Sequence, residues 1–258
     1  MTRTDATGRI LAIASGKGGV GKTVFAITLA HALARRGRRV LLFDGDLGLA
    51  NVDIQLGLTP PHDLGAVAAG RIGLADAVLP YAPGGFDILA GRSGSGALAA
   101  LEVAAQERLI EGLRALVHGY DVTLLDLGAG LDRGTRRFCA IADTLLVLAI
   151  DEPTSLTDAY AVLKIDHADR PEGDARIVVN QAVSRGAGER TYATLRRACA
   201  TFLGRAPALA GVIRRDERVR DAIRRQSLLL TRHPSAPAAI DVERIALGLL
   251  EPVEAMRV

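Results

Sequence analysis

One octapeptide constrains the fold more than any other part of the sequence. Residues 16–23 spell Gly-Lys-Gly-Gly-Val-Gly-Lys-Thr, between the apolar run Ile10–Ala14 and the helical pattern Thr23–Arg36. Glycines let backbone N–H groups turn inward around phosphate oxygens, and the following helix points its positive dipole end at the same anion. The segment therefore predicts a phosphate loop between a buried strand and a helix. The backbone of the loop is expected to come from Gly16, Gly18, Gly19, Val20 and Gly21.

Three side chains of this loop have expected roles of their own. Lys22 is placed to reach the β- and γ-phosphates of a nucleotide, and the Thr23 hydroxyl is placed to ligate Mg²⁺. Lys17 is a second lysine, which a basic phosphate loop does not need. The chain has three lysines among 32 cationic residues, so two in one loop indicate a need for compact point charges. Lys17 is expected to lie over its own nucleotide or to reach the phosphates of a neighbouring subunit.

Acidic residues end three apolar runs that are typical of buried strands. Asp44, Asp126 and Asp151 are expected at carboxyl ends of parallel strands, where ligands of α/β sheets bind. Asp126 follows two leucines, as expected of a carboxylate that holds Mg²⁺ through water. Of Asp44 and Asp46, one is expected to hold magnesium waters and the other to orient an attacking water. Gly128 offers a backbone N–H to a γ-phosphate, whereas Asp151 is more typical of a cap or turn.

Short apolar runs alternate with helical patterns along most of the chain. Strands are expected at 10–14, 40–43, 86–90, 122–125, 144–150, 175–179 and 209–213, and helices at 23–36, 97–118, 155–166, 188–201, 216–225 and 238–250. This alternation predicts an α/β, doubly wound, mostly parallel sheet with helices on both faces, of the P-loop NTPase type. We expect one ATPase domain over 10–258, which includes the last helix, after a polar stub at 1–9.

Composition excludes several classes of protein. Apolar residues make up 49% of the chain, too many for a disordered protein. No apolar run reaches the roughly 18 residues of a membrane span, and the N-terminus lacks the apolar core of a secretory signal. Cys139 and Cys199 lie far apart, which argues against a disulfide framework or a metal cluster within one chain. These features favour the cytoplasm.

Four stretches resemble a known family. The segment Lys17–Thr23 resembles the deviant Walker A motif of the ParA/MinD ATPases. DGDLGLANVD at Asp44–Asp53, DLGAG at Asp126–Gly130 and EPTSLTDAY at Glu152–Tyr160 are similar to segments of the FlhG/FleN-type flagellar members. The resemblance covers nearly the whole chain after Arg9.

The resemblance implies an ATPase that is monomeric with ADP and forms a sandwich dimer with ATP. By position, it assigns Lys17 to the ATP of the partner subunit and Asp46 to the hydrolytic water. It assigns Asp44 and Asp126, with Thr23, to Mg²⁺. It also implies that Asn180, which follows the apolar run at 177–179, recognises the adenine base.

The resemblance also implies a biological role. Flagellar members limit the number and placement of flagella, and their partners are an FlhF-type GTPase, flagellar C-ring proteins or a flagellar transcription activator. Three features depart from the family pattern. Residues 1–9 lack the "DQA--LR" motif that stimulates the GTPase, Arg214 stands where many relatives have proline, and Leu127 stands where threonine or proline is usual.

Other functions remain open from the sequence. One is a positioning ATPase for the division site or for DNA partitioning, which the arginine-rich stretch Arg185–Arg225 favours. Another is a nucleotide-gated transcriptional anti-activator for which hydrolysis is unimportant. A third is a reductase that shares a cluster between subunits through Cys139 and Cys199. The apolar stripe at 241–250 has a mostly acidic polar face, so we expect it to pack on the domain and to bind membranes weakly, with the protein cytoplasmic or peripheral at the inner membrane or pole.

Overall fold

A central sheet organises the computed structural model, which describes residues 8–46, 50–91, 103–130 and 132–251. Its strand order is β3-β4-β2-β5-β1-β6-β7-β8, and all neighbours are parallel except β3 and β4. The strands are β1 (Arg9–Ser15), β2 (Val40–Gly45), β3 (Leu79–Tyr81), β4 (Phe86–Leu89), β5 (Val122–Ala129), β6 (Thr144–Ala149), β7 (Asp174–Ala182) and β8 (Ala208–Arg214). The predicted doubly wound, mostly parallel α/β fold is confirmed.

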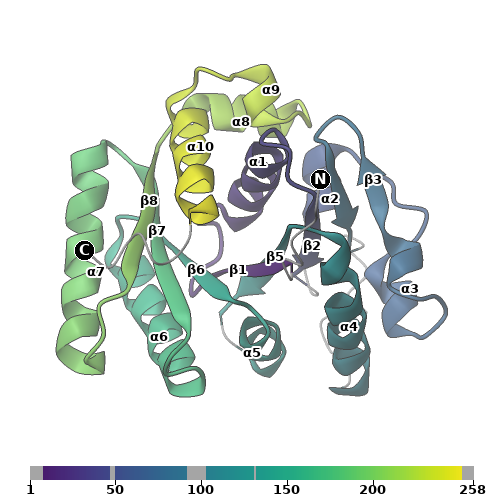
Figure 1. Ribbon diagram of the computed structural model, residues 1–258. Coiled ribbons are helices and arrows are strands. Elements are labelled where there is room, and N and C mark those ends of the chain that lie inside the picture. The colour runs from purple at the N-terminus through teal and green to yellow at the C-terminus, as the bar shows by residue number, and fades with distance from the viewer. Residues whose placement is uncertain (1–7, 47–49, 92–102, 131, 252–258) are drawn as a thin grey trace.

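Helices cover both faces of this sheet (Figure 1). One face carries α1 (Lys22–Ala34), α2 (Val52–Leu56), α8 (Glu217–Arg224), α9 (Leu229–Arg232) and α10 (Pro237–Leu250). The other carries α3 (Leu64–Ala68), α4 (Val103–Leu116), α5 (Arg133–Ala140), α6 (Pro153–Asp169) and α7 (Arg185–Leu203), with short 3-10 turns η1 (Ala75–Ala77) and η2 (Val117–Gly119). None of the helices within the described ranges is long and apolar enough to cross a bilayer.

Burial on both faces explains why the strands are apolar runs rather than alternating patterns. In β1, Ile10, Ala12 and Ala14 pack into the core beneath α4–α7, whereas Leu11 and Ile13 pack beneath α1 and α10. Helix α1 is apolar nearly all round because it lies between the sheet and the outer helices α9 and α10. The phosphate-loop helix is therefore enclosed on nearly every side.

Two boundaries differ from the predicted ones in a way that affects the site. The strands β2 and β5 continue past Asp44 and Asp126, which pair with each other in register inside the sheet. The prediction that both strands end at these aspartates is therefore wrong. The strand β1 also starts at Arg9, within the stretch expected to be a stub. The elements α2, α3, α5, α9 and β3 were not predicted; residues 97–102 of the expected long helix lie outside the described residues.

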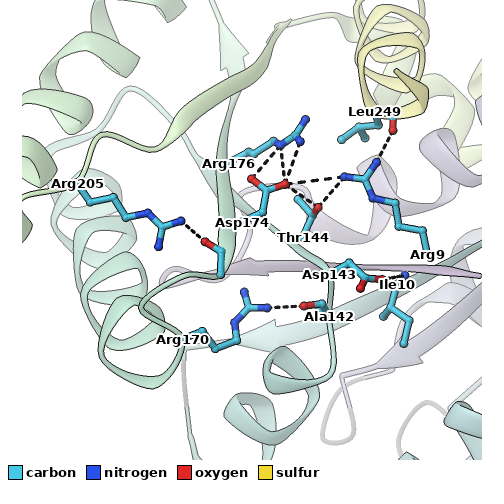
Figure 2. A network of polar contacts seen from close by, with 11 residues as sticks. Arg9, Ile10, Ala142, Asp143, Thr144, Arg170, Asp174, Arg176, Arg205 and Leu249 are labelled. Carbon is cyan, nitrogen blue, oxygen red and sulfur yellow. Dashed lines mark hydrogen bonds and ion pairs between the residues drawn. The ribbon is translucent and has the colours of Figure 1, made fainter. Parts of the chain in front are cut away.

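A polar network joins the amino ends of β1, β6 and β7 to the last turn of α10 (Figure 2). The Arg9 guanidinium donates to the Leu249 carbonyl at 2.6 Å and to the Thr144 hydroxyl at 2.8 Å. That hydroxyl donates to Asp174 at 2.8 Å, and Arg176 donates to the same carboxylate at 2.9 Å. This edge of the sheet, opposite the phosphate loop, is closed by paired charges.

Candidate functional site

A cavity of about 590 Å³ opens beside the carboxyl ends of the strands, between the loop that follows β1 and the ends of β7 and β8. Its lining includes seven of the residues singled out from the sequence. These are Gly18, Gly19, Gly21, Lys22, Thr23, Asp46 and Asn180. Residues drawn from three separate segments of the chain therefore share one cavity, as expected for a ligand site in an open α/β sheet.

Two glycines fix the path of the phosphate loop. Gly21 has a φ of 93°, which favours glycine, and an added Cβ would lie 2.6 Å from the Asn180 side-chain nitrogen. That nitrogen donates to the Val20 carbonyl at 2.7 Å, so β7 is tied to the loop. At Gly16, a Cβ would lie 2.5 Å from Asp158 on α6. Larger residues at either position would push the loop away from its neighbours.

Lys22 is held in a buried position beneath the loop. Its ammonium donates to the Ser15 hydroxyl at 3.0 Å, and that hydroxyl donates to the Lys17 carbonyl at 2.7 Å. Burial lowers the pKa of Lys22, and the neighbouring Asp126 and Asp46 carboxylates oppose this shift. The side chain is thus a desolvated cation that an anionic ligand would stabilise.

Two buried carboxylates lie side by side beneath the loop. Burial raises the pKa of Asp126 to about 7, although the Thr23 hydroxyl and the Lys22 ammonium oppose the shift. The Thr23 hydroxyl lies beside this carboxylate, yet neither oxygen of Asp126 has a partner with hydrogen-bond geometry among the described residues. Burial and the charge of Asp126 likewise raise the pKa of Asp44 well above its usual range. One oxygen of Asp44 accepts the backbone N–H groups of Asn51 and Val52, and the other is without a partner in the described chain.

These orphaned oxygens fit a divalent cation. Buried polar groups normally have partners, and an unpartnered carboxylate is costly unless a ligand compensates it. The described residues contain no cluster of three or more side chains that would hold a metal by themselves. Mg²⁺ has no need of such a cluster, since it keeps several waters and binds through one or two carboxylates and substrate phosphates. The residues that would hold Mg²⁺ are Thr23, Asp44 and Asp126, because the Thr23 hydroxyl and the two carboxylates are neighbours.

Asp46 lies closer to the cavity than the other two acids. A Cβ at Gly128 would lie 3.4 Å from an Asp46 carboxylate oxygen, which places this side chain against the β5 backbone. Asp46 also lines the cavity, whereas Asp44 and Asp126 do not. A carboxylate beside both the phosphate loop and Gly128 is suited to orient a water near the terminal phosphate of a nucleotide.

Lys17 is directed away from the cavity. Its ammonium forms an ion pair with Glu152 at 2.5 Å and donates to the Thr154 hydroxyl at 3.1 Å. Both partners belong to the start of α6, and Glu152 is half-exposed. The segment Glu152–Tyr160 carries part of the family resemblance, but no contact between it and the loop was predicted. The contact depends on the fold because the two residues are 135 positions apart.

Comparison with known proteins identifies the family. The model of the CobQ/CobB/MinD/ParA nucleotide binding domain matches residues 11–229. Antiactivator FleN of Pseudomonas aeruginosa is 39% identical over 238 residues, which cover 92% of this chain and 85% of FleN. This chain belongs to the CobQ/CobB/MinD/ParA nucleotide-binding family.

Two further proteins are similar to this chain. Flagellum site-determining protein YlxH of Helicobacter pylori is 29% identical over 187 residues, covering 72% of this chain and 63% of YlxH. The septum site-determining protein MinD of Pyrococcus horikoshii, solved with Mg-ADP, has the same fold. Its TM-score is 0.79 at 24% identity, over 95% of this chain and 96% of that one.

Several residues of the cavity were not predicted as ligands. They belong to the end of β8, to α8 and to α10: Arg214, Arg215, Asp216, Glu217, Val219, Arg220, Ile223, Ala238 and Val242. Only Arg214 carried a signal, as a departure from the MinD/ParA pattern. The others follow no local motif, since the fold alone brings α10 next to the phosphate-loop helix.

Three residues considered from the sequence lie apart from the cavity. Asp151 is exposed at the end of β6. Cys139 and Cys199 are buried in the core on the α4–α7 face, and burial raises the pKa of the Cys139 thiol to about 12. A protonated, enclosed thiol is a packing group rather than a ligand at a subunit surface. These positions give no support to the shared cluster of a reductase.

Proposed function

We propose that the chain is an ATP-dependent dimerisation switch with slow, Mg²⁺-dependent hydrolysis, and that it regulates the number or placement of flagella. The observation that carries the nucleotide chemistry is the set of carboxylate oxygens that are unpartnered in the described chain, one on Asp44 and two on Asp126, near the buried Lys22. The flagellar role is supported by the similarity to FleN and to YlxH.

In this proposal the loop binds the phosphates and places them for reaction. The backbone of Gly16–Gly21 and the Lys22 ammonium take the negative charge, while Thr23, Asp44 and Asp126 hold the metal. Magnesium, when bound, would supply positive charge that offsets the charge of the phosphates. Asp46 orients the attacking water by accepting its hydrogen bond, and Gly128 donates its N–H to the terminal phosphate.

Lys17 has a separate part in the proposal. Its ion pair with Glu152 keeps it outside the cavity of its own subunit. We place it on the phosphates of the partner's nucleotide in the ATP-bound homodimer, which requires it to leave Glu152. An exposed pair contributes little stability, on the order of 1 kcal/mol or less, so this exchange is an easy one.

The packing of the helix α10 indicates whether the protein binds membranes directly. Its apolar stripe is buried against α1 and β8, through Val242, Ile245, Ala246 and Leu249. A stripe that is covered by the fold is not available to lipid, so we place the protein in the cytoplasm, with any membrane or polar association through a partner. Such partners are an FlhF-type GTPase or flagellar C-ring proteins. Co-sedimentation of the purified protein with anionic liposomes at physiological salt would contradict this.

Inhibition of a flagellar transcription activator is a second candidate, favoured by the name antiactivator carried by FleN. The ATP-bound dimer would then capture the activator, and hydrolysis would only reset it. A role in DNA partitioning rests only on the arginine-rich stretch, in which Arg185, Arg220 and Arg225 form exposed ion pairs with neighbouring acids.

Deletion of the gene and a count of flagella per cell by electron microscopy test the proposal. Extra, absent or misplaced flagella, restored by the wild type and not by Lys22→Ala, are expected. Normal flagella in the deletion strain would contradict the flagellar role and favour a MinD/ParA-type positioning role at the division site or on DNA. The variant Asp46→Ala separates the two candidates, since it should trap the ATP dimer. Full function of that variant would show that hydrolysis is dispensable.

A further inference from the structure

One wall of the cavity is formed by the end of β8 and the start of α10. Arg214, the last residue of β8, pairs in register with Ala182 of β7. Asn180, which the family resemblance makes the reader of adenine, lies two residues before Ala182 on the same strand. Arg214 and Asn180 both line the cavity, together with Ile213. This wall is distinct from the phosphate loop, which carries the cationic Lys22.

The Arg214 side chain is fixed by one buried acid. Asp241 on α10, only 5% exposed, accepts from the Arg214 Nε at 2.7 Å and Nη2 at 2.9 Å. The same carboxylate accepts the Arg214 backbone N–H at 3.0 Å. The Nη2 group also lies 3.3 Å from the Pro237 carbonyl. A guanidinium held on two nitrogens by one carboxylate has a defined plane.

The remaining nitrogen of this guanidinium is available to a ligand. Nη1 of Arg214 has no hydrogen-bond partner within the described part of the chain, and about a third of the side chain is exposed. Purine bases present ring nitrogens as hydrogen-bond acceptors and a flat face on which a guanidinium stacks. Phosphates are a less suitable partner for this arginine because Asp241 already neutralises its charge.

We propose that Arg214 contacts the nucleobase and that Asp241 is a positioning residue that fixes the plane of its guanidinium. The inference rests on the proposed function, in which this cavity holds ATP or ADP. It adds a base-contacting residue at a position where many MinD/ParA relatives have proline, which has no side-chain donor. Binding of the base is thereby coupled to α10 through Arg214, which does not contact the phosphates.

A purely structural role makes a different prediction. Arg214 and Asp216 both hold the start of α10, since Asp216 also accepts from the Ala238 N–H at 3.4 Å. If this were the whole role of Arg214, its replacement would destabilise the fold and lower the affinity of every ligand of the cavity by the same factor. A base contact affects only ligands that carry a base.

Isothermal titration calorimetry with Mg-ADP and with Mg-pyrophosphate separates the two cases, because the probes share two phosphates and only one has a base. The variant Arg214→Lys keeps a cation beside Asp241 and removes the planar fork. We expect its Kd for ADP to rise about tenfold, as for loss of a charged hydrogen bond, with the Kd for pyrophosphate unchanged. Asp241→Asn should shift the ADP affinity in the same direction by about threefold, since it only frees the guanidinium. Arg218→Lys, the same charge-conserving substitution at a residue outside the cavity lining, is the control.

Each outcome decides between these cases. A selective loss of ADP binding in Arg214→Lys, with control values at the wild-type level, supports the base contact. Unchanged binding of both probes, or an equal loss of both, overturns it. Wild-type protein that binds pyrophosphate but has no greater affinity for ADP would also overturn it, while leaving the phosphate loop intact. Wild-type protein that binds neither probe would instead overturn the proposed function, and the base contact with it.

Discussion

Among the described residues, buried charges are paired at the amino ends of the parallel strands and left without partners at their carboxyl ends. At the amino ends of the strands, Asp174 accepts from Arg176 and from Thr144, and Arg9 completes the network at the Leu249 carbonyl (Figure 2). At the carboxyl ends, Asp126 is buried with neither of its oxygens partnered in the described chain. The network at the amino ends of the strands therefore links β1 to the last turn of α10. At the carboxyl ends, carboxylate oxygens near the cavity are left without partners within the described ranges.

This contrast separates stability from function. A satisfied network stabilises the folded state, and breaking it costs free energy. An unpaired buried carboxylate costs free energy in the empty protein and is compensated when a cation binds. We therefore expect substitutions at the amino edge to affect the free energy of unfolding, and substitutions at the carboxyl edge to affect ligand affinity.

The largest expected effect is at the carboxyl edge. Lys22→Ala should weaken Mg-ATP binding by about a hundredfold or more, because the one buried ammonium of the loop is lost. Its midpoint of thermal unfolding without nucleotide should stay near that of the wild type, since among the described residues the Lys22 ammonium donates one hydrogen bond, to Ser15. Calorimetric titration and thermal scans of the same sample measure both. A large loss of stability in this variant would break the comparison.

At the amino edge, Asp174→Ala should destabilise the fold by about 2 kcal/mol. It leaves the guanidinium of Arg176, which is 5% exposed, without its carboxylate and removes the acceptor of Thr144. Urea unfolding measures the change, and Asp174→Asn, which keeps an acceptor, should lose less. The control is Asp76→Ala, in the 3-10 turn η1, where the carboxylate makes a local contact with the Gly73 N–H. An unchanged unfolding midpoint would remove the stabilising role of the network.

An unpaired group away from both edges gives a pH dependence. His31 on α1 is buried, its Nδ1 has no partner in the described residues, and burial with the charge of Arg35 lowers its pKa to about 4. Between pH 6.5 and 4 the unfolded chain binds a proton that the folded chain does not, so stability falls as pH falls through this window. The slope from this one group is at most about 1.4 kcal/mol per pH unit. Urea titrations of wild type and His31→Leu should show a smaller acid slope in the variant, and equal slopes would contradict the assignment.

The smallest expected effect has the opposite sign. Asp126→Asn should stabilise the nucleotide-free protein by about 1 kcal/mol at pH 8, because a desolvated carboxylate is removed. The same change should abolish the additional stabilisation by Mg²⁺ with nucleotide. Asp121→Asn is the matched control, because hydrogen bonds from Arg39 lower the pKa of Asp121 and its loss should not stabilise. Thermal scans with and without Mg-ADP decide, and a destabilised Asp126→Asn would contradict the cost assigned to this acid.

The sequence was sufficient for the parts of the protein that local chemistry controls. The octapeptide at Gly16–Thr23 requires a strand before it and a helix after it, and β1 and α1 occupy those places. The apolar runs predicted a parallel sheet because only a strand covered on both faces is apolar throughout. The position of Asp46 after an apolar run likewise predicted its place near the loop, and Asp46 lines the cavity, whereas only the family resemblance singled out Asn180.

Tertiary structure alone decided the remainder. Strand ends depend on pairing, and the register of Asp44 with Asp126 carries both strands beyond the residues where their apolar runs stop. The contacts of Lys17 with Glu152 and of Arg214 with Asp241 join residues 135 and 27 positions apart, and no local pattern encodes them. Which buried acids have partners is likewise a property of packing. A sequence names the charged groups of a site, whereas only the fold determines which are neutralised within the protein and which are left for a ligand.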